Sequence, residues 1–353
     1  MSALQEFLEI IVNQKASDLH LTVGSLPRIR VNGKIVELNT FNIITSDYLQ
    51  QIIAPYLNKQ QLENLNNNIE VDLTIGINGL GRFRTNLFKQ RGNLVAAIRC
   101  LPFEIPDINS LGLPETVLNL TMKKKGLILI TGGTGSGKST TLAALIKKIS
   151  NELNGHIITI EDPIEYLFNH SKAIVNQREI GIDSKSFPSA LRSSLRQDPD
   201  VVVIGELRDC ESMSAALTIA ETGHLVFATL HTNSAIGTIN RLVDVFPPTK
   251  QDIIRMNLSM SLEAIISQQL LPNIENSRSL ALEILINTSS IQTLIRDNNV
   301  HQIENYILSG SQDGMIRMDD SILSLYNEDM ITKDIALSYA HNPSTLEKKL
   351  NNF

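Results

Sequence analysis

The sequence contains no tryptophan, only two cysteines and no long apolar run. Cys100 and Cys210 are too few for a disulfide framework or a four-cysteine zinc site, and this content fits a reducing compartment. No apolar run approaches the roughly 18 residues that a membrane-spanning helix requires. Near the N-terminus, Glu6 and Glu9 interrupt the apolar residues and no basic segment precedes them, so we expect no signal peptide. These absences predict a soluble cytoplasmic protein without a membrane span of its own.

Charge is also scarce, and its balance is slightly acidic. The 31 Lys and Arg residues against 37 Asp and Glu residues give a formal net charge of -6, so no nucleic-acid partner is expected. Charged residues make up 19% and hydrophobic residues 42%, a balance that supports a sizeable core and excludes a wholly disordered chain. The length of 353 residues suffices for two or three domains.

Residues 1–100 have the pattern of a small mixed α/β domain. An opening helix is predicted by four apolar residues at helical spacing, Leu4, Phe7, Leu8 and Ile11. A helical stretch is also predicted over Ser46–Asn66, and Asn-Gly pairs at 32–33 and 78–79 predict hairpin turns. The expected strands are Asp18–Val23, Pro27–Val31, Lys34–Glu37, Glu70–Ile77, Gly81–Gln90 and Leu94–Arg99.

Residues 101–114 are rich in proline and predict a linker with few continuous backbone hydrogen bonds. From residue 115, buried-type strands alternate with helices, which is the pattern of a mostly parallel sheet. The expected strands are Leu127–Thr131, His156–Glu161, Val201–Ile204 and Leu225–Leu230, and the expected helices are Lys138–Glu152, Ser186–Arg196 and Glu211–Glu221. From Lys250 the chain is predicted to be largely helical, with Ile253–Leu270 as one long periodic stretch.

A glycine-rich string after the first of these strands is the most specific signal in the chain. It fits G-x-x-x-x-G-K-[ST] between a buried strand and a helix, as a phosphate-binding loop requires. Glycines let backbone N–H groups converge on phosphate oxygens, and the helix N-terminus adds the positive end of its dipole. Lys138 is placed to reach the β- and γ-phosphates and Ser139 to ligate Mg²⁺. The predicted nucleotide-binding residues are Gly132, Gly133, Thr134, Gly135, Ser136, Gly137, Lys138, Ser139 and Thr140.

Carboxylates follow two of the other expected strands. One strand runs into Gly205 and Glu206 where an Asp is usual, so we interpret the Mg²⁺- or water-orienting role as shared or shifted to Glu206. Another ends in Thr159–Glu165, which holds three carboxylates within five residues and suits water activation beside a polyphosphate. A surface glutamate and a solvated helix start are the alternative interpretations.

Histidines and arginines complete the candidate set. His224 and His231 flank the last expected strand, and γ-phosphate contact is one interpretation against that of ordinary structural histidines. Arg82 and Arg84 share a strand face, and Arg99 lies on the next strand. These arginines form either a surface basic stripe or a set offered to a nucleotide that a neighbouring subunit binds.

In this order, the motifs resemble those of the type II/IV secretion ATPases, and among them the pilus retraction motors of the PilT/PilU family. Thr159–Glu165 looks like the family's Asp box and Gly205–Arg208 like its atypical Walker B motif. Ala220–His224 and Ala228–Thr232 look like its His box. The resemblance covers nearly the whole chain, and the further matching strings are Ala16–His20, Gly81–Arg84, Asn176–Gly181 and Asp198–Asp200.

The resemblance implies a homohexamer that binds ATP and Mg²⁺. Each subunit would pair a PAS-like N-terminal α+β domain, residues 1–100, with a RecA-like P-loop ATPase domain, residues 115–353, across the 101–114 linker. The second domain would carry a mostly parallel sheet and a helical C-terminal region, and ATP would sit between the two domains. The resemblance therefore gives the fold class as α/β with two unlike domains.

It also implies roles for single residues. On the matching positions, Glu165 and Glu206 would be the catalytic and Mg²⁺- or water-orienting carboxylates, and Ser139 would be the other Mg²⁺ ligand. His231, together with His224, would sense the γ-phosphate. The arginines that would approach nucleotide from the N-terminal side are Arg82, Arg84 and Arg99.

Departures from the family pattern help to distinguish between the kinds of motor within the family. Assembly and type II secretion ATPases usually carry a four-cysteine zinc insertion, which two cysteines cannot supply. Retraction motors carry A-I-R-N-L-I-R-E, whereas Ser290–Asp297 has Gln292 and Thr293 in place of an Arg and the Asn. Ile286–Thr288 and the tail from residue 314 to 340 look rather like PilU.

The sequence therefore favours an ATP-hydrolysing motor for pilus retraction and twitching motility. The alternatives are an auxiliary PilU-like ATPase that depends on a partner motor, a secretion or DNA-transfer ATPase, and a non-enzymatic nucleotide-dependent scaffold. The implied partners are an inner-membrane pilus platform protein and a paralogous pilus ATPase, and the implied location is the inner face of the cytoplasmic membrane.

Overall fold

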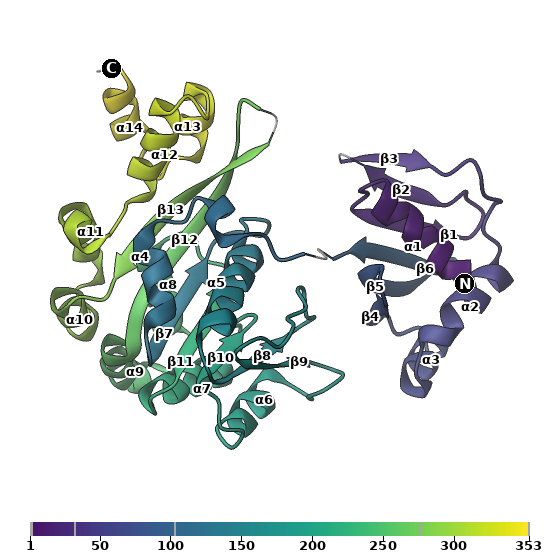
Figure 1. Ribbon diagram of the computed structural model, residues 1–353, viewed down its shortest axis with the longest axis horizontal. Helices are drawn as coiled ribbons and strands as arrows, with labels where there is room; N and C mark the ends of the chain where they lie inside the picture. The colour runs from purple at the N-terminus through teal and green to yellow at the C-terminus, as the bar shows by residue number, and fades with distance from the viewer. Residues whose placement is uncertain (1–2, 32, 102–103, 276, 352–353) are drawn as a thin grey trace. The chain divides into compact units, whose positions relative to one another are not determined.

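A computed structural model describes residues 3–31, 33–101, 104–275 and 277–351 (Figure 1). They form two compact units, one of residues up to Glu104 and one of Ile105–Ile164 together with the chain from Phe168 on. Each unit has its own sheet and its own buried core. Asn32 of the first predicted turn and Pro102 of the predicted linker lie outside the described residues.

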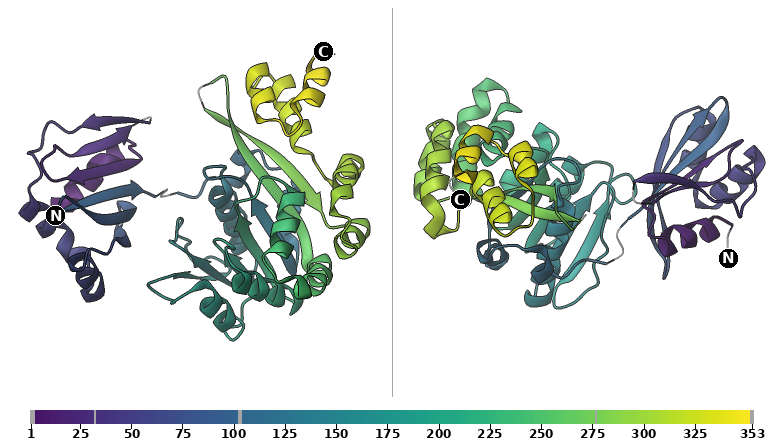
Figure 2. Two further views of the ribbon diagram at one scale, coloured as in Figure 1. Left: turned by 180° about the vertical axis from the view of Figure 1, so that it is seen from behind. Right: turned by 90° about the horizontal axis from the view of Figure 1, so that it is seen from above.

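The first unit is built on a six-stranded sheet in the order β3-β2-β1-β6-β5-β4, in which every neighbouring pair is antiparallel (Figure 2). Its strands are β1 (Asp18–Thr22), β2 (Arg28–Val31), β3 (Lys34–Glu37), β4 (Val71–Ile77), β5 (Gly81–Gln90) and β6 (Asn93–Cys100). Its helices are α1 (Ala3–Asn13), α2 (Ser46–Ile53), the 3-10 turn η1 (Ala54–Tyr56) and α3 (Lys59–Asn66). All six predicted strands of this unit are confirmed.

Strict alternation gives the first sheet one buried face. In β5, Phe83 and Leu87 are fully buried, whereas Arg84, between them in sequence, is exposed on the opposite face. The predicted opening helix is confirmed. The centroid of the Phe7 ring on this helix lies 4.5 Å from that of Phe41, and the two rings are tilted by 37°. The predicted helical stretch 46–66 is not continuous, because a proline interrupts it and a new capping box starts α3.

The second unit is built on a seven-stranded sheet in the order β13-β12-β7-β11-β10-β8-β9. Its strands are β7 (Gly126–Thr131), β8 (His156–Glu161), β9 (Ile174–Glu179), β10 (Val201–Ile204), β11 (Leu225–Leu230), β12 (Leu262–Pro272) and β13 (Arg278–Ile286). Its helices up to the last strand are α4 (Glu115–Asn119), α5 (Lys138–Glu152), α6 (Phe187–Ser194), α7 (Cys210–Glu221), α8 (Ala235–Asp244) and α9 (Pro248–Ser261). Those after it are α10 (Ser289–Arg296), α11 (Ile303–Ser309), α12 (Met318–Asn327), α13 (Lys333–Tyr339) and α14 (Pro343–Leu350). Only β13 runs antiparallel to its neighbour, so the predicted mostly parallel sheet is confirmed.

Helices cover both faces of this second sheet (Figure 1). Ile128 and Ile130 of β7 pack into a core with α4 and α5, and Leu127 and Leu129 of the same strand pack into a separate core with α6–α10. Successive residues of a strand point to opposite faces, so burial on both sides requires a continuous apolar run. That requirement explains why β7, β8, β10 and β11 are found where the sequence predicts them.

The prediction of one long helix over Ile253–Leu270 is wrong. Helix α9 ends at Ser261, and the rest of that segment is β12, which pairs with β7 on one side and β13 on the other. A strand buried on both faces cannot be told from a buried helix by periodicity alone, and no glycine or proline between Ile253 and Leu270 marks the change from α9 to β12. The polar edge strand β9 was missed for the opposite reason, because Ile174–Glu179 has no apolar run.

The segment predicted as a linker contains one short turn. Ile108–Leu111 forms a 3-10 turn, and the Lys147 ammonium on α5 donates to the carbonyl of Ile105 at 3.2 Å. The part of the linker from Ile105 on therefore belongs to the second unit.

The C-terminal helices pack on a ribbon that extends from the sheet. Strands β12 and β13 continue beyond the end of β7 as a two-stranded ribbon (Figures 1 and 2). Leu271 and Ala281 of this ribbon are fully buried in a core with α12–α14, where their partners include Met318, Ile322 and Leu346. Among the described residues, the strand members of this core come from β12 and β13.

Leu271→Ala should loosen these helices. Removing a fully buried leucine side chain costs about 2–5 kcal/mol, and the cavity would open between β12 and α12–α14. We expect faster hydrogen exchange confined to Met318–Leu350, measured by mass spectrometry. Ile274→Ala, at a side chain that is 58% exposed, is the matched control and should leave exchange unchanged. Unaltered protection in the Leu271 variant would contradict this packing.

Candidate functional site

The carboxyl ends of four parallel strands bring the phosphate-binding loop, Glu206 and His231 to one edge of the second sheet. Strands β7, β11, β10 and β8 lie side by side, with Ile204 in register with Ile160 and Ala228. Each strand therefore ends near the same level, which is where parallel α/β sheets bind ligands. The phosphate-binding loop follows β7, Asp162 follows β8, Glu206 lies just after β10, and His231 follows β11.

The loop after β7 is shaped to leave its backbone open. A Cβ on Gly132 would lie 2.4 Å from the carbonyl oxygen of Gln268 and 2.5 Å from Ser136 Oγ, and the backbone φ of +145° also favours glycine. At the other end, Gly137 adopts a left-handed conformation and caps α5. The tip between them, residues 133–135, is exposed. This is a cradle that side chains would fill.

Two polar groups inside the loop fit a phosphate ligand. Lys138 is 8% exposed, and its ammonium donates to the carbonyls of Gly132 at 2.8 Å and Gly133 at 2.9 Å, so its charge is held inside the loop. Ser136 Oγ is buried and has no hydrogen-bond partner among the described residues. A cradle of backbone groups, an inward cation and an orphaned hydroxyl suit the oxygens of a nucleotide's phosphates.

Glu206 is the centre of a charged cluster at the same edge. Its Oε2 accepts a hydrogen bond from Arg208 Nη2 at 2.8 Å, and its Oε1 lies 3.3 Å from His231 Nε2. Arg208 also lies 4.0 Å from Asp162, the residue after β8. The hydrogen bond to Glu206 raises the pKa of the Arg208 guanidinium, and Asp162 adds to the effect. The carboxylate is thus oriented by a partner on each oxygen.

Gly205, which stands where an Asp is usual, lies in a tight place between two strands. Gly205 N donates to the carbonyl of Ile160 at 2.8 Å, and a Cβ on Gly205 would lie 3.2 Å from the Cα of Glu161. A side chain there would require β8 to give by a few tenths of an ångström. The carboxylate at this end of β10 belongs to the next residue, Glu206, which contacts Arg208 and His231.

Other predicted residues do not join this cluster in the same way. Glu165 is exposed on the loop between β8 and β9. His224 precedes β11, so the six residues of the strand separate it from His231, and its ring contacts the carbonyl of Ile219 and the hydroxyl of Thr222. Within one subunit, the two histidines lie at opposite edges of the sheet.

The three arginines share a face of the first unit. Arg84 lies directly opposite Arg99 across β5 and β6, and Arg82 is on the same side of β5. Arg99 Nε donates to Asp18 Oδ1 at 2.9 Å. Burial alone would raise the pKa of Asp18, but hydrogen bonds from Ser17 and Arg99 hold it below its ordinary range. Of the three arginines, Arg99 therefore already has an anionic partner within the sheet, the carboxylate of Asp18.

Two residues near the site were missed by sequence reasoning. Arg208 ends the Walker B-like string, and its spacing from Glu206 was a signal that could have found it. Gln268 lies behind the phosphate-binding loop, with its carboxamide Nε2 donating to Thr141 at 2.9 Å. No local signal points to Gln268, because its segment was expected to be helical.

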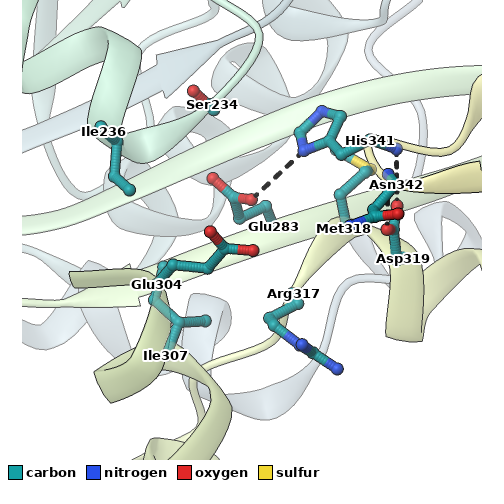
Figure 3. Close-up of a pocket in the computed structure, with 10 residues that line it drawn as sticks. All are labelled: Ser234, Ile236, Glu283, Glu304, Ile307, Arg317, Met318, Asp319, His341 and Asn342. Atoms are coloured by element: carbon teal, nitrogen blue, oxygen red, sulfur yellow. Dashed lines mark hydrogen bonds and ion pairs between the residues drawn. The ribbon is translucent and has the colours of Figure 1, made fainter. Parts of the chain in front are cut away.

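A second polar region of the same unit surrounds a pocket of about 350 Å³ between β13 and the C-terminal helices (Figure 3). Glu283 Oε1 accepts from the N–H of Ala235 at 2.6 Å, and Oε2 lies 3.8 Å from His341 Nδ1. Burial raises the pKa of Glu283 and Glu304 adds to it, while the Ala235 N–H and His341 act in the opposite direction. Glu283, Glu304 and His341 point toward one another across the pocket (Figure 3).

Comparison with known proteins shows which family this chain belongs to. The family described as Type II/IV secretion system protein matches residues 2–306. The chain belongs to this family. A relative described as the type IV pilus retractation ATPase PilT of Pseudomonas aeruginosa is 41% identical over 96% of this chain and 98% of its own length. The PilU ATPase of the same organism is 38% identical over 97% of this chain and 90% of its own length.

A solved structure has the same fold. The crystal structure of the pilus retraction motor PilT with bound ADP is similar with a TM-score of 0.90 and 48% identity, over 97% of this chain and 98% of that one. This secretion-family chain is therefore an ATPase with the predicted two-part α/β fold. Among the described residues, no helix combines the length and apolarity that crossing a membrane requires.

Gly205→Ala should lower the rate of ATP hydrolysis more than it lowers the stability of the fold. The added methyl group would press on the backbone of β8 and displace Glu206 from Arg208 and His231. We expect kcat for ATP to fall on the order of 10-fold, because a small displacement of side chains at a nucleotide site lowers turnover. Gly76→Ala, where a Cβ meets nothing within 4 Å, is the control. Wild-type kcat in the Gly205 variant would show that the close approach does not position Glu206.

The buried carboxylate of Glu283 predicts how the stability of the fold depends on pH. Because the folded-state pKa of Glu283 is raised above its ordinary 4.5, the native state holds a proton that the unfolded chain releases. Its contribution is complete below pH 4.5 and is lost as pH rises through the raised pKa. Glu283→Gln should remove that loss, so its unfolding midpoint should fall less between pH 4.5 and neutrality than the wild type's. Glu347→Gln, on the exposed face of α14, is the control. Parallel curves for wild type and the Glu283 variant would refute the assignment.

Proposed function

We propose that this chain is a Mg·ATP-driven motor that powers retraction of a type IV pilus as a homohexameric ring. The observation that carries the proposal is the phosphate-binding loop facing the Glu206–His231 pair at one sheet edge. It occurs in a chain that matches a pilus retraction ATPase over nearly its whole length. Twitching motility, which depends on retraction, would then be the visible output.

The residues of the loop would hold the nucleotide. Backbone N–H groups between Gly132 and Gly137 would bind the phosphates, with Lys138 balancing their charge. Ser139 and Glu206 would hold Mg²⁺, which supplies charge neutralisation at the β- and γ-oxygens when bound. Few protein ligands are needed, since Mg²⁺ at such sites keeps waters and phosphate oxygens in its shell.

Three further groups would act around the phosphates. Glu165 would serve as the base that orients the attacking water, and its exposed loop would have to close on the nucleotide to do so. His231 would sense the γ-phosphate through its contact with Glu206. The arginines would stabilise transition-state charge on a nucleotide bound by a neighbouring subunit. They are Arg82, Arg84 and Arg99.

In a ring of subunits, His224 would be able to contact a neighbouring subunit. Its edge of the sheet is remote from the phosphate-binding loop of its own subunit. A role in catalysis would therefore require contact with another subunit. The proposed partners are an inner-membrane platform protein and a paralogous pilus ATPase, at the inner face of the cytoplasmic membrane.

The runner-up function is an auxiliary ATPase that works only beside a partner motor. It is supported by 38% identity to PilU and by the changed run on α10, where Gln292 and Thr293 replace an Arg and an Asn of the retraction-motor motif. Both residues lie on the outer part of α10, and Thr293 is exposed. A changed surface with an unchanged nucleotide loop suits a change of partner rather than of chemistry.

Lys138→Ala should abolish both hydrolysis and retraction. Loss of a cation that stabilises transferring phosphate lowers kcat on the order of 100-fold. A deletion strain should carry excess pili and no twitching motility, and Lys138→Ala should not restore it, whereas Lys148→Ala, at a surface i,i+4 ion pair on the same helix, should. Pilus counts and twitching zones are the measurements.

Other outcomes of this experiment are equally clear. Unchanged pilus numbers in the deletion strain would favour a secretion or DNA-transfer ATPase. Full complementation by Glu206→Ala would favour a scaffold. Complementation that fails when the paralogous motor is also deleted would favour the auxiliary role.

A further inference from the structure

Strand β12 forms the rear wall of the phosphate-binding loop. Ser267 is in register with Thr131, the last residue of β7, and their hydroxyl groups lie 2.9 Å apart. The next residue, Gln268, therefore lies beside Gly132, where β7 gives way to the loop. Beyond this point β12 continues with β13 as the ribbon seen in Figure 1.

Gln268 touches the loop and the helix that follows it. Its side chain is buried with the residue 1% exposed, and its Nε2 donates to Thr141 Oγ1 at 2.9 Å, in the first turn of α5. Its main-chain oxygen lies 2.4 Å from the position that a Cβ on Gly132 would take. Two residues along, Leu270 lies 3.5 Å from the corresponding position on Gly137. One strand thus contacts both ends of the loop and the start of α5.

The carboxamide of Gln268 is an unfavourable way to fill this space. Its Oε1 is buried and has no hydrogen-bond partner among the described residues, and a buried unsatisfied acceptor destabilises the fold. A methionine of nearly the same shape would fill the site without that cost. What methionine cannot supply is the Nε2 donor to Thr141.

We propose that Gln268 is a positioning residue for ATP hydrolysis. Through Thr141 it fixes the first turn of α5, and with it Lys138 and Ser139, in the orientation that the phosphates require. Gln268 itself does not touch the reacting atoms. The proposal concerns the ATPase reaction on the isolated protein, so it stands or fails independently of any role in a pilus.

The test separates function from stability. In the full-length protein, Gln268→Met should lower the affinity for ADP and kcat/KM for ATP about 2- to 10-fold, the range of one hydrogen bond. The Gln268→Met/Thr141→Val double variant leaves neither the orphaned oxygen nor an orphaned hydroxyl, so its melting temperature without nucleotide should be equal to or higher than the wild type's. A purely structural glutamine would show a lower melting temperature instead. Gln269→Met, at the neighbouring residue on the opposite side of β12, should leave both kinetic values unchanged.

A double-mutant cycle assigns the effect to the bond. Thr141→Val removes the acceptor with little change of shape, so the double variant should be no worse than either single variant. Additive losses would overturn the proposal, as would wild-type ADP affinity in Gln268→Met. Should that variant fail to fold, Thr141→Val alone decides, since wild-type ADP affinity in it would also overturn the proposal.

Discussion

The parallel register of β8, β10, β11 and β7 is the constraint on which the site depends. Each strand is hydrogen-bonded to the next without a slip, so their carboxyl ends deliver the phosphate-binding loop, Glu206 and His231 to one edge. A shift of one residue in any strand would turn its side chains to the other face of the sheet. The apolar residues buried on both faces prevent such a shift, so the core that stabilises the domain also sets the geometry of the candidate site.

Close backbone approach is the second consequence of this register. Glycine is required where the loop leaves β7 against β12, at Gly132, and the space is tight where β10 leaves the sheet against β8, at Gly205. The carboxylate at the end of β10 is carried by the next residue, Glu206. Arg208 and His231 orient this carboxylate, which does not project from a strand.

Local patterns predicted the elements whose environment is uniform along the strand. The loop of Gly132–Ser139, its flanking β7 and α5, and three more parallel strands could be placed because apolar runs and glycine spacing are local signals. The segment 262–270 could not, because α9 runs directly into β12 with no glycine or proline between them, whereas glycine or proline flanks each of the four predicted strands. The same error hid Gln268, whose position beside the loop is set only by pairing between β12 and β7. His224 and His231 were predicted to flank one strand, and they do, but the family resemblance alone grouped them in one role although the strand holds them at its two ends.

The ribbon of β12 and β13 gives the nucleotide loop and the C-terminal helices a common backbone. Alternate residues of β12 serve different neighbours: Gln268 and Leu270 face the loop and α5, whereas Gln269 lies 3.5 Å from His341 and Leu271 packs against α12–α14. A strand is stiff along its length, so a shift that re-seats Gln268 also shifts the surface on which the last helices rest. The same ribbon carries Glu283, whose carboxylate holds the start of α8 and faces His341. Adjacent residues of one strand therefore contact both the phosphate-binding loop and the C-terminal helices.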